Sequence, residues 1–350
     1  MLSLAGWYGP GIGVLKASPV QLKSPESPIS LIVAVHNEER YLPDFIDAIS
    51  EQRDIDFEIV IVLNGCTDNS LAICEFWRQK NSRVKIIELT EANKKLAITK
   101  GIQLATNDLL VFTDVDCRPA SPFWLREMAA ALQKNAGIII GYSPIIFDRS
   151  LIGFFSKSEN FLTGIQYLGA AAWQRPYMAV GRNMAYTRQV FFGVGGFKSH
   201  QKIASGDDDL FVQSAVRQGI GCRIQWNPEA FVNTFPPENF KYYLHRKSRH
   251  FTASFHYPSL TLLGLSATYA GRLWMWISPI FLLWAGFPLW RSVFFLLCYL
   301  GLSYLIWKPL STKLCEKDIL KHLWWSDLCI TFAWLIAGFT SLFRNRKRWI

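Results

Sequence analysis

Short apolar runs alternate with segments of helical spacing along the chain from residue 29 to residue 113. The runs are nearly continuous and rich in β-branched residues, which is typical of strands buried on both faces of a sheet. Strands joined through helices make right-handed crossovers in a parallel sheet. We therefore predict an α/β fold with a mainly parallel sheet and flanking helices. The expected strands are 29–35, 58–63, 84–88 and 109–113, and the expected helices are about 42–49, 69–80 and 95–105.

The two ends of the chain differ from this region. Residues 1–15 carry no charge but several glycines, and residues 16–28 contain three prolines. We expect 1–28 to be a loosely packed tail and linker. One α/β domain is predicted for residues 29–258, and residues 259–350 form a separate, strongly hydrophobic region.

Three long apolar segments lie in that last region, at 273–290, 292–307 and 323–343. The shortest has 16 residues, which gives a helix of about 24 Å against a hydrocarbon core of about 30 Å. Tryptophans cluster near the segment ends, as in interfacial belts. We predict a membrane region with two or three spanning helices, and a buried helical subdomain is the alternative.

The basic residues between and after these segments do not agree on how many of the segments span the membrane. The loop 308–321 carries four lysines, and two spans before it would return it to the cytosol, as the positive-inside rule requires. A third span would export the basic tail at 344–348, against the same rule. The third segment is therefore expected to be re-entrant or interfacial, or else to break the rule.

Composition narrows the functional classes. Half of the chain is hydrophobic and 18% is charged, which excludes intrinsic disorder and suits a membrane-associated protein. The net charge of +10 fits nucleic acid, anionic lipid or phosphate-bearing ligands. The seven cysteines stand singly and lack the spacing of a zinc site, which indicates reduced thiols.

Polar residues follow three of the predicted strands. In a parallel sheet, ligands bind beyond the carboxyl ends of the strands, so these residues are expected to line one crevice. They are His36, Asn37 and Glu38 after the first strand, the segment from Asn64 to Asp68 after the second, and Asp114 and Asp116 after the fourth.

Asp114 and Asp116 are spaced so that both carboxylates can reach one divalent cation. Mg²⁺ and Mn²⁺ use one or two carboxylates and leave other positions to water and substrate phosphates. The cation would offset the charge of a diphosphate leaving group. The alternative is a phosphatase in which the first aspartate of such a pair is the nucleophile.

Three consecutive acids, Asp207 to Asp209, precede an apolar run and predict the start of a helix. Capping and the helix dipole account for one or two acids at such a place. Three in a row repel one another, which favours a functional carboxylate here. At the mouth of a crevice it would serve as a general base for a hydroxyl.

Basic residues occur at two further places. Lys94 and Lys95 begin an expected helix, where a cation opposes the helix dipole, so they face a phosphate or form a solvated pair. Arg246 and Arg249 are spaced to share a helix face and suit a pyrophosphate or anionic membrane lipid. Their closeness to the apolar segments argues against nucleic acid.

Taken in order, these motifs resemble those of the family 2 glycosyltransferases with a GT-A fold, over roughly residues 29–255. The ordered matches make the resemblance more specific than any one motif. They are His36-Asn37-Glu38, the segment Asn64 to Ser70, Lys94 with Ala97 and Gly101, Asp114 with Asp116, Gly181 to Tyr186 with Gly195-Gly196-Phe197, Asp207 to Leu210, and Arg246 with Arg249-His250.

The resemblance implies a role for each matched residue. Asp207 would be the catalytic base, and Mg²⁺ or Mn²⁺ would be held by Asp116 and Asp114. The nucleotide sugar would be contacted by Asn37, Glu38, Asn64, Lys94, Asp114, Arg246 and Arg249. The acceptor side would be formed by Gly181, Arg182, Asn183, Asp208, Asp209 and His250.

These roles imply an inverting glycosyltransferase. The apolar segments predict that it is anchored by several passes in the cell membrane, and its catalytic domain should be cytoplasmic because nucleotide sugars are cytosolic. The donor would be a nucleotide-diphosphate sugar, UDP-sugar being the first expectation, and the acceptor a hydroxyl of a lipid-linked or polysaccharide molecule. His250 replaces the Trp of processive synthases, which favours transfer of one or a few sugars. Asn64 and Gly206 replace acidic residues, so a catalytically inactive binding or scaffold subunit of a polysaccharide-synthesis complex is the alternative.

Overall fold

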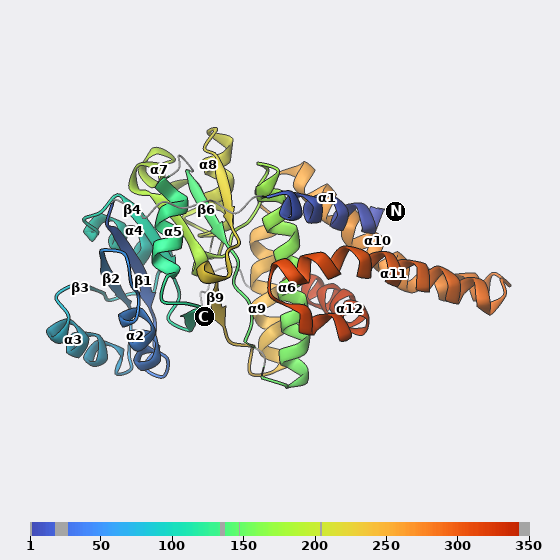
Figure 1. The fold of residues 1–350 in the computed structure, drawn as a ribbon, viewed down its shortest axis with the longest axis horizontal. Helices are drawn as coiled ribbons and strands as arrows, with labels where there is room; N and C mark the ends of the chain where they lie inside the picture. The colour runs from blue at the N-terminus through green and yellow to red at the C-terminus, as the bar shows by residue number, and fades with distance from the viewer. Residues whose placement is uncertain (1, 18–26, 134–136, 147, 204, 343–350) are drawn as a thin grey trace. The chain divides into compact units, whose positions relative to one another are not determined.

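A computed structural model describes residues 2–17, 27–133, 137–146, 148–203 and 205–342 (Figure 1). The described residues divide into two compact units. The sheet unit comprises 27–144 and 174–235, and the helical unit comprises 2–17, 145–173 and 236–342. These bounds differ from the predicted 29–258 domain, because 145–173 and 236–258 group with the C-terminal helices.

The sheet unit contains every strand and helix predicted from the alternating pattern, with ends that agree within one residue. Its elements are β1 (Ile29–Val35), α2 (Leu42–Ser50), β2 (Phe57–Asn64), α3 (Ser70–Lys80), β3 (Val84–Leu89), α4 (Lys94–Leu104), β4 (Leu109–Thr113), β5 (Cys117–Pro119), α5 (Trp124–Gln133), β6 (Ile138–Gly141), η1 (Gly181–Asn183), β7 (Met184–Thr187), α7 (Arg188–Gly193), η2 (Lys198–His200), α8 (Asp209–Arg217), β8 (Cys222–Gln225), η3 (Pro228–Ala230) and β9 (Val232–Thr234).

The main sheet has the order β3-β2-β1-β4-β7-β6-β8. Strands β3, β2, β1 and β4 are parallel, and so are β6 and β8, whereas β7 is antiparallel to both of its neighbours. The predicted mainly parallel sheet is confirmed, and β7 is the departure from it. The chain leaves β1 on one side for β2 and returns on the other for β4, so the ligand crevice is expected between the carboxyl ends of β1 and β4.

Two further segments reach that edge of the sheet. Because β7 runs antiparallel to β4, with Met184 opposite Phe112, its first residue lies at the carboxyl end of β4. Helix α4 begins five residues after the end of β3, so its first turn lies at the same edge. The topology therefore gathers residues from four places in the sequence.

Close packing fixes α4 on the sheet. A Cβ atom on Gly101 would lie 2.7 Å from Cγ2 of Ile32 and 3.1 Å from Cγ2 of Val62. Only glycine lets the helix approach β1 and β2 this closely, since Cβ contacts below about 3.0 Å do not occur in real side-chain packing. The other face of β1 is equally dense, with Leu31 and Val33 fully buried.

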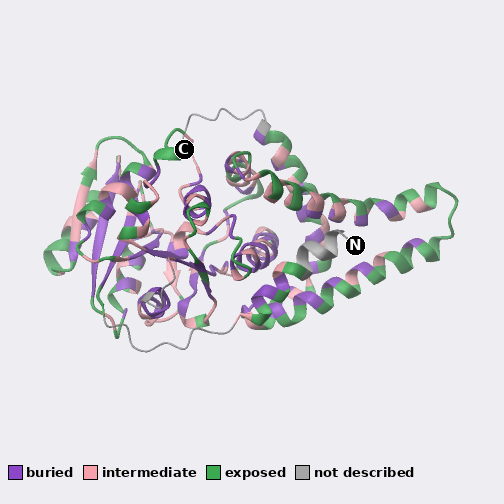
Figure 2. Ribbon diagram, turned by 90° about the horizontal axis from the view of Figure 1, so that it is seen from above, coloured by how far each residue is buried: buried purple, intermediate pink, exposed green. Residues whose placement is uncertain are grey.

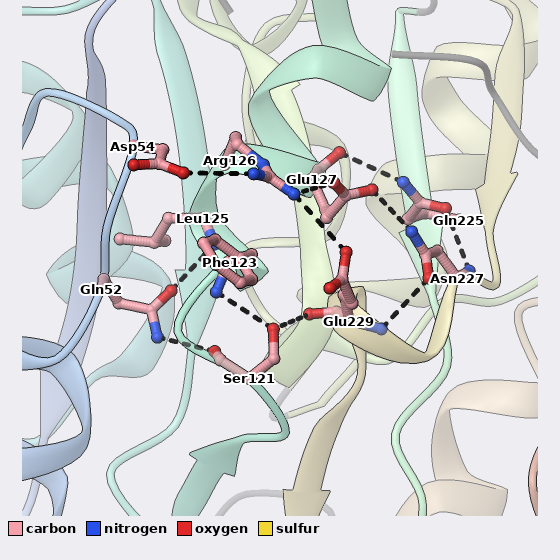
Figure 3. A network of polar contacts seen from close by, with 10 residues as sticks. All are labelled: Gln52, Asp54, Ser121, Phe123, Leu125, Arg126, Glu127, Gln225, Asn227 and Glu229. Atoms are coloured by element: carbon pink, nitrogen blue, oxygen red, sulfur yellow. Dashed lines mark hydrogen bonds and ion pairs between the residues drawn. The ribbon is translucent and has the colours of Figure 1, made fainter. Parts of the chain in front are cut away.

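A polar network joins α5 to the segment that follows β8 (Figure 3). Arg126 lies 3.0 Å from Glu127 and 3.5 Å from Glu229. Glu127, which is almost fully buried, accepts a hydrogen bond of 2.9 Å from the Asn227 amide. The network fixes the helix that follows the Asp114–Asp116 loop.

The helical unit consists of α1 (Leu2–Lys16), α6 (Leu151–Ala172), α9 (Phe240–Ser254), α10 (Ser259–Trp284), α11 (Leu289–Lys313), η4 (Lys317–Lys321) and α12 (Leu323–Leu342). The expectation of a loosely packed tail at the N-terminus is wrong for Leu2–Lys16, which form α1. A Cβ on Gly169 of α6 would meet the backbone of Pro10 at 2.3 Å, so α1 and α6 cross closely. The Lys313 ammonium caps α1 by donating to the carbonyls of Val14, Leu15 and Ala17.

The predicted apolar segment 273–290 is not one helix. Helix α10 ends at Trp284, Gly286 has a φ of +81°, and α11 begins at Leu289, so a tight turn divides the segment. Within the described residues, two helices are long and apolar enough to cross a membrane by length and composition, α11 and residues Leu323–Ser341 of α12. Figure 2 shows exposed residues along the α10–α11 hairpin. Trp284, at the end of α10, is 82% exposed.

A charged pair lies buried where three of these helices meet. Arg272 of α10 and Asp327 of α12 are both completely buried and form an ion pair of 2.5 Å. Asp327 also accepts hydrogen bonds of 2.9 Å from the Trp276 indole and 3.0 Å from the Tyr299 hydroxyl of α11. Asp327, the only charged residue of the sequence segment 323–343, thus has three hydrogen-bonding or ionic partners.

Glu58 connects the amino-terminal ends of several strands. Its Oε1 accepts hydrogen bonds of 2.5 Å from the Ser30 hydroxyl and from the Thr106 amide, and its Oε2 lies 2.7 Å from Nζ of Lys85. Burial acts to raise the pKa of Glu58, but the hydrogen bonds from Lys85, Ser30 and Thr106 outweigh it and lower the pKa to about 2.

We predict that Glu58→Gln lowers the free energy of unfolding at pH 7 by about 2 kcal/mol, because charged hydrogen bonds are lost. A carboxyl group with a depressed pKa stabilises the fold above its unfolded pKa and loses this effect as pH falls towards its folded pKa. The difference from wild type should therefore shrink between about pH 4.5 and pH 3. Thermal unfolding at pH 7, 4 and 3 measures it, with the exposed Glu91→Gln as control. A deficit that is independent of pH would contradict the role given to this carboxylate.

Candidate functional site

Two acidic side chains, one just after β4 and one just before α8, face one ammonium group at the carboxyl edge of the sheet. Nζ of Lys94 lies 3.1 Å from Oδ1 of Asp114 and 3.5 Å from Oδ2 of Asp207. Both carboxylates line a small cavity together with Lys94, Gly181 and Asp208. Burial alone would lower the pKa of Lys94, but the charges of the three aspartates raise it well above its usual range. The group therefore remains an ammonium ion between carboxylates.

The turn after β1 is bound to the turn after β2. Asn37 adopts a left-handed backbone with a φ of +57°, and its Oδ1 accepts a hydrogen bond of 2.7 Å from the Thr67 amide. The Glu38 amide donates to the Ser70 hydroxyl at 2.9 Å. The side-chain oxygen of Asn37 thus binds another part of the protein. These contacts do not involve its side-chain nitrogen.

Glu38 lies in a strongly negative part of the site. Burial raises the pKa of its carboxyl group, and the charges of Asp116, Asp114 and Asp68 raise it further, to about 7, although Lys94 acts in the opposite direction. These influences place Glu38 within electrostatic reach of both residues of the Asp114–Asp116 pair.

Asn64, at the end of β2, has an unused donor. Its side chain is 1% exposed, and its Oδ1 accepts a hydrogen bond of 2.6 Å from the Asn93 amide. Its Nδ2 is buried and has no hydrogen-bond partner among the residues that the structure describes. Buried N–H groups are normally partnered, so this amide nitrogen is an exception within the described residues.

The acids available for a metal ion are few. In the described ranges, no group of three or more His, Cys, Asp and Glu side chains is arranged to hold a metal ion by itself. The charges of the predicted ligands Asp114 and Asp116 both raise the pKa of Glu38, and Asp114 also attracts the Lys94 ammonium. Such a pair would need oxygens from a bound ligand to complete the coordination.

The three consecutive acids have different surroundings. Asp207 faces Lys94, as described above. Asp208 accepts hydrogen bonds from the amides of Gly181 at 3.0 Å and Asp209 at 2.8 Å, and burial followed by the charge of Asp207 raises its pKa to about 6. Asp209 is 6% exposed and accepts a hydrogen bond of 3.3 Å from the Ala179 amide. Capping thus describes only Asp208, which also lines the cavity beside Asp207, whereas Asp209 binds a neighbouring segment.

The segment predicted for the acceptor side is split between the cavity and the core. Gly181 lines the cavity, and Arg182 next to it is half-buried. Asn183 is fully buried, donates to the carbonyls of Tyr142 and Ala230, and accepts from the Trp124 indole at 3.1 Å. With its amide engaged on both sides, Asn183 supports the fold, and the expectation that it contacts an acceptor is not supported.

The remaining predicted residues fall elsewhere. Arg246, Arg249 and His250 lie on α9, which belongs to the helical unit, and their proposed roles stay predictions. The expected solvated pair at the start of α4 is wrong, because Lys94 contacts two aspartates and Lys95 is only 6% exposed. These two lysines stood out in the sequence because a cation at the start of a helix opposes the helix dipole.

Known proteins are similar to this chain in sequence and in structure. The family described as Glycosyl transferase family 2 matches residues 30–199. An uncharacterised glycosyltransferase of Haemophilus influenzae is 25% identical over 58% of this chain and 64% of its own length. The uncharacterised glycosyltransferase YibD of Escherichia coli is 21% identical over 63% of this chain and 62% of its own length. The chain therefore spans somewhat less than two thirds of these two relatives.

A solved structure shows the same fold. The mannosyltransferase PcManGT from Pyrobaculum calidifontis, solved in complex with GDP-Man and Mn²⁺, is similar with a TM-score of 0.60 and 17% identity. The similarity covers 95% of this chain and 96% of that one. The predicted GT-A fold is thereby confirmed. The family match shows that residues 30–199 form a family 2 glycosyltransferase domain, as the motifs predicted.

Proposed function

We propose that this protein is an inverting glycosyltransferase that moves a sugar from a nucleotide-diphosphate sugar to an acceptor hydroxyl. The observation that carries the proposal is the bridge from Asp114 through Lys94 to Asp207. It brings an acid at the carboxyl end of β4, suited to the donor side, next to an acid suited to accept a proton. The family match over residues 30–199 supports the same reaction class.

Asp207 is the proposed general base. The acceptor hydroxyl attacks the anomeric carbon as its proton passes to a carboxylate oxygen of Asp207. The bond from the anomeric carbon to the diphosphate oxygen breaks on the opposite side, and the diphosphate leaves with the electron pair. One displacement of this kind inverts the configuration of the anomeric carbon.

The donor is proposed to bind between the ends of β1, β2 and β4. Glu38, Asn64, Lys94 and Asp114 are the proposed contacts, with the unpartnered Nδ2 of Asn64 directed to an acceptor atom of the nucleotide. UDP-sugar is the proposed donor, and the GDP-Man bound by the solved mannosyltransferase makes a GDP-sugar the main alternative.

Mg²⁺ or Mn²⁺ is the proposed cofactor, with Asp116 and Asp114 as its protein ligands. When bound, the ion would offset the negative charge that develops on the leaving diphosphate. The solved mannosyltransferase contains Mn²⁺, which supports this choice.

The acceptor is proposed to be a lipid-linked or polysaccharide hydroxyl at the cytoplasmic face of a membrane. Helices α11 and α12 support membrane attachment by their length and composition. A relative from Haloferax volcanii, 22% identical, is named a glucosyl-dolichyl phosphate glucuronosyltransferase, and that name supports a lipid-linked acceptor.

The reaction is tested by incubating detergent-purified protein and Mn²⁺ with UDP-, GDP- and dTDP-sugars and measuring the nucleotide released. We expect turnover with one nucleotide class. Asp207→Asn should reduce kcat by about 10²- to 10⁴-fold, because general-base catalysis is lost, with the donor KM changed only a few-fold. The exposed Asp56→Asn should behave as wild type. Full activity of Asp207→Asn would remove it as the base, and release from no donor would favour the inactive scaffold.

Lys94 should compete with a metal ion for Asp114 when no nucleotide is present. We therefore predict that Lys94→Met binds Mn²⁺ at least about tenfold more tightly than wild type, since a unit charge about 4 Å away is removed. The free Mn²⁺ signal in electron paramagnetic resonance measures this affinity, with Lys100→Met of the same helix as control. Equal affinities for Lys94→Met and wild type would show that Mn²⁺ does not use Asp114.

Membrane attachment predicts how the protein fractionates. Membranes from expressing cells should retain the protein in the pellet after a wash in sodium carbonate at pH 11, and detergent should release it. Hydrophobic insertion resists alkaline washing, whereas electrostatic attachment through a basic patch does not. Release by carbonate would contradict the proposed spanning role of α11 and α12.

A further inference from the structure

Lys95 is a buried cation whose hydrogen-bond partners are backbone oxygens of one loop. It lies in the first turn of α4 and is 6% exposed. Its ammonium donates to the carbonyls of His200 at 2.8 Å, Ile203 at 2.5 Å and Ser205 at 3.0 Å. The loop leads directly into Asp207. We propose that Lys95 is a positioning residue that fixes this loop so that Asp207 faces the reaction centre, an inference that rests on the proposed function.

The chemistry of the contact favours a positioning role. A lysine ammonium has three N–H donors, and three carbonyls satisfy all of them. Burying a charge is costly unless it is fully hydrogen-bonded, and an apolar side chain would fill the same space without that cost. The ammonium gathers three carbonyls that no single neutral side chain could bind together, so it defines the path of the loop.

The base of this anchor is itself rigid. Asn93 caps α4 by accepting a hydrogen bond of 3.1 Å from the Leu96 amide, and the Asn93 amide donates to Asn64 at 2.6 Å. The contact of Gly101 with the sheet fixes the other end of the helix. Lys95 therefore projects from a helix that is attached to the sheet at both ends.

The loop beyond the anchor reaches the catalytic position within two residues. Gly206 has a φ of +80°, and its carbonyl accepts a hydrogen bond of 3.2 Å from the Leu210 amide. Asp207 thus lies between the carbonyls bound by Lys95 and the first turn of α8. Burial lowers the pKa of Lys95, whereas the charges of Asp207 and Asp208 act in the opposite direction, so both acids lie within electrostatic reach.

The neighbouring residues Lys94 and Lys95 therefore have different roles. Lys94 binds the carboxylates themselves, and Lys95 binds the main chain that carries one of them. Loss of Lys95 should leave the donor-side residues Glu38, Asn64 and Asp114 in place while the base loses its orientation. The expected defect is in the transfer step and not in donor binding.

The test compares Lys95→Met with the matched control Lys100→Met in the same helix. Wild type and both variants are assayed in detergent with the nucleotide sugar that wild type turns over, and the pH dependence of kcat is recorded. We expect Lys95→Met to lower kcat by at least about 30-fold with the donor KM within about threefold of wild type. Lys100→Met should match wild type in both constants.

A second measurement is independent of activity. Hydrogen exchange of backbone amides at 207–212 is measured without donor, and we expect faster exchange in Lys95→Met than in wild type or Lys100→Met. Unchanged exchange would show that Lys95 does not fix the loop. Faster exchange with an unchanged kcat, or with a donor KM that rises in proportion, would overturn the positioning role.

The two measurements also separate this inference from the proposed function. If wild type turns over no donor, the proposed function fails and the catalytic part of the inference fails with it, whatever the exchange data show. If wild type is active and Lys95→Met is as active, only the inference on Lys95 is wrong.

Discussion

The contact of one ammonium ion with acids from two parts of the chain is the interaction on which the candidate site depends. Asp114 follows a strand and Asp207 precedes a helix nearly a hundred residues later, yet both lie within 3.5 Å of Lys94. Carboxylates gathered at one place repel each other and tend to take up protons. The lysine charge offsets this repulsion, because it lies between the two carboxylates.

The backbone brings this ammonium into place before any ligand binds. Gly101 allows α4 to approach the sheet, and Asn93 caps its first turn against the end of β2. The antiparallel strand β7 begins at the carboxyl end of β4 and brings Gly181 to the cavity. The reacting groups therefore stand on regular elements packed to the sheet, an arrangement that limits their freedom before the substrate arrives.

The first half of the sheet could be predicted from sequence because local composition determines it. Runs such as 29–35 are buried on both faces, and their continuous apolar character shows this without tertiary information. Strand β7 escaped prediction because it is four residues long and its orientation depends on pairing with β4, some 70 residues earlier. The segment 273–290 was misjudged because hydrophobicity continues through the turn at Gly286, which only backbone conformation reveals.

Some residues of the candidate site could likewise be predicted from the sequence, and others could not. Asp114, Lys94 and Asp207 were predicted from motif order, and the structure brings them together. The assignment of Asn183 and Asp209 to the acceptor side came from sequence neighbours, but hydrogen bonds to the core occupy both side chains. A sequence motif gives the order of residue types. Which of those residues are buried and which are accessible depends on the helix or turn that they form.

The buried pair of Arg272 and Asp327 has a consequence for the order of assembly. During synthesis α10 leaves the ribosome with its arginine more than fifty residues ahead of the aspartate that neutralises it. Until α12 is made, the guanidinium must stay in contact with water or with other polar groups, since an unpaired charge is not stable in an apolar interior. The final packing of α10 therefore waits for α12, and a nascent chain that stops short of residue 327 cannot complete the bundle.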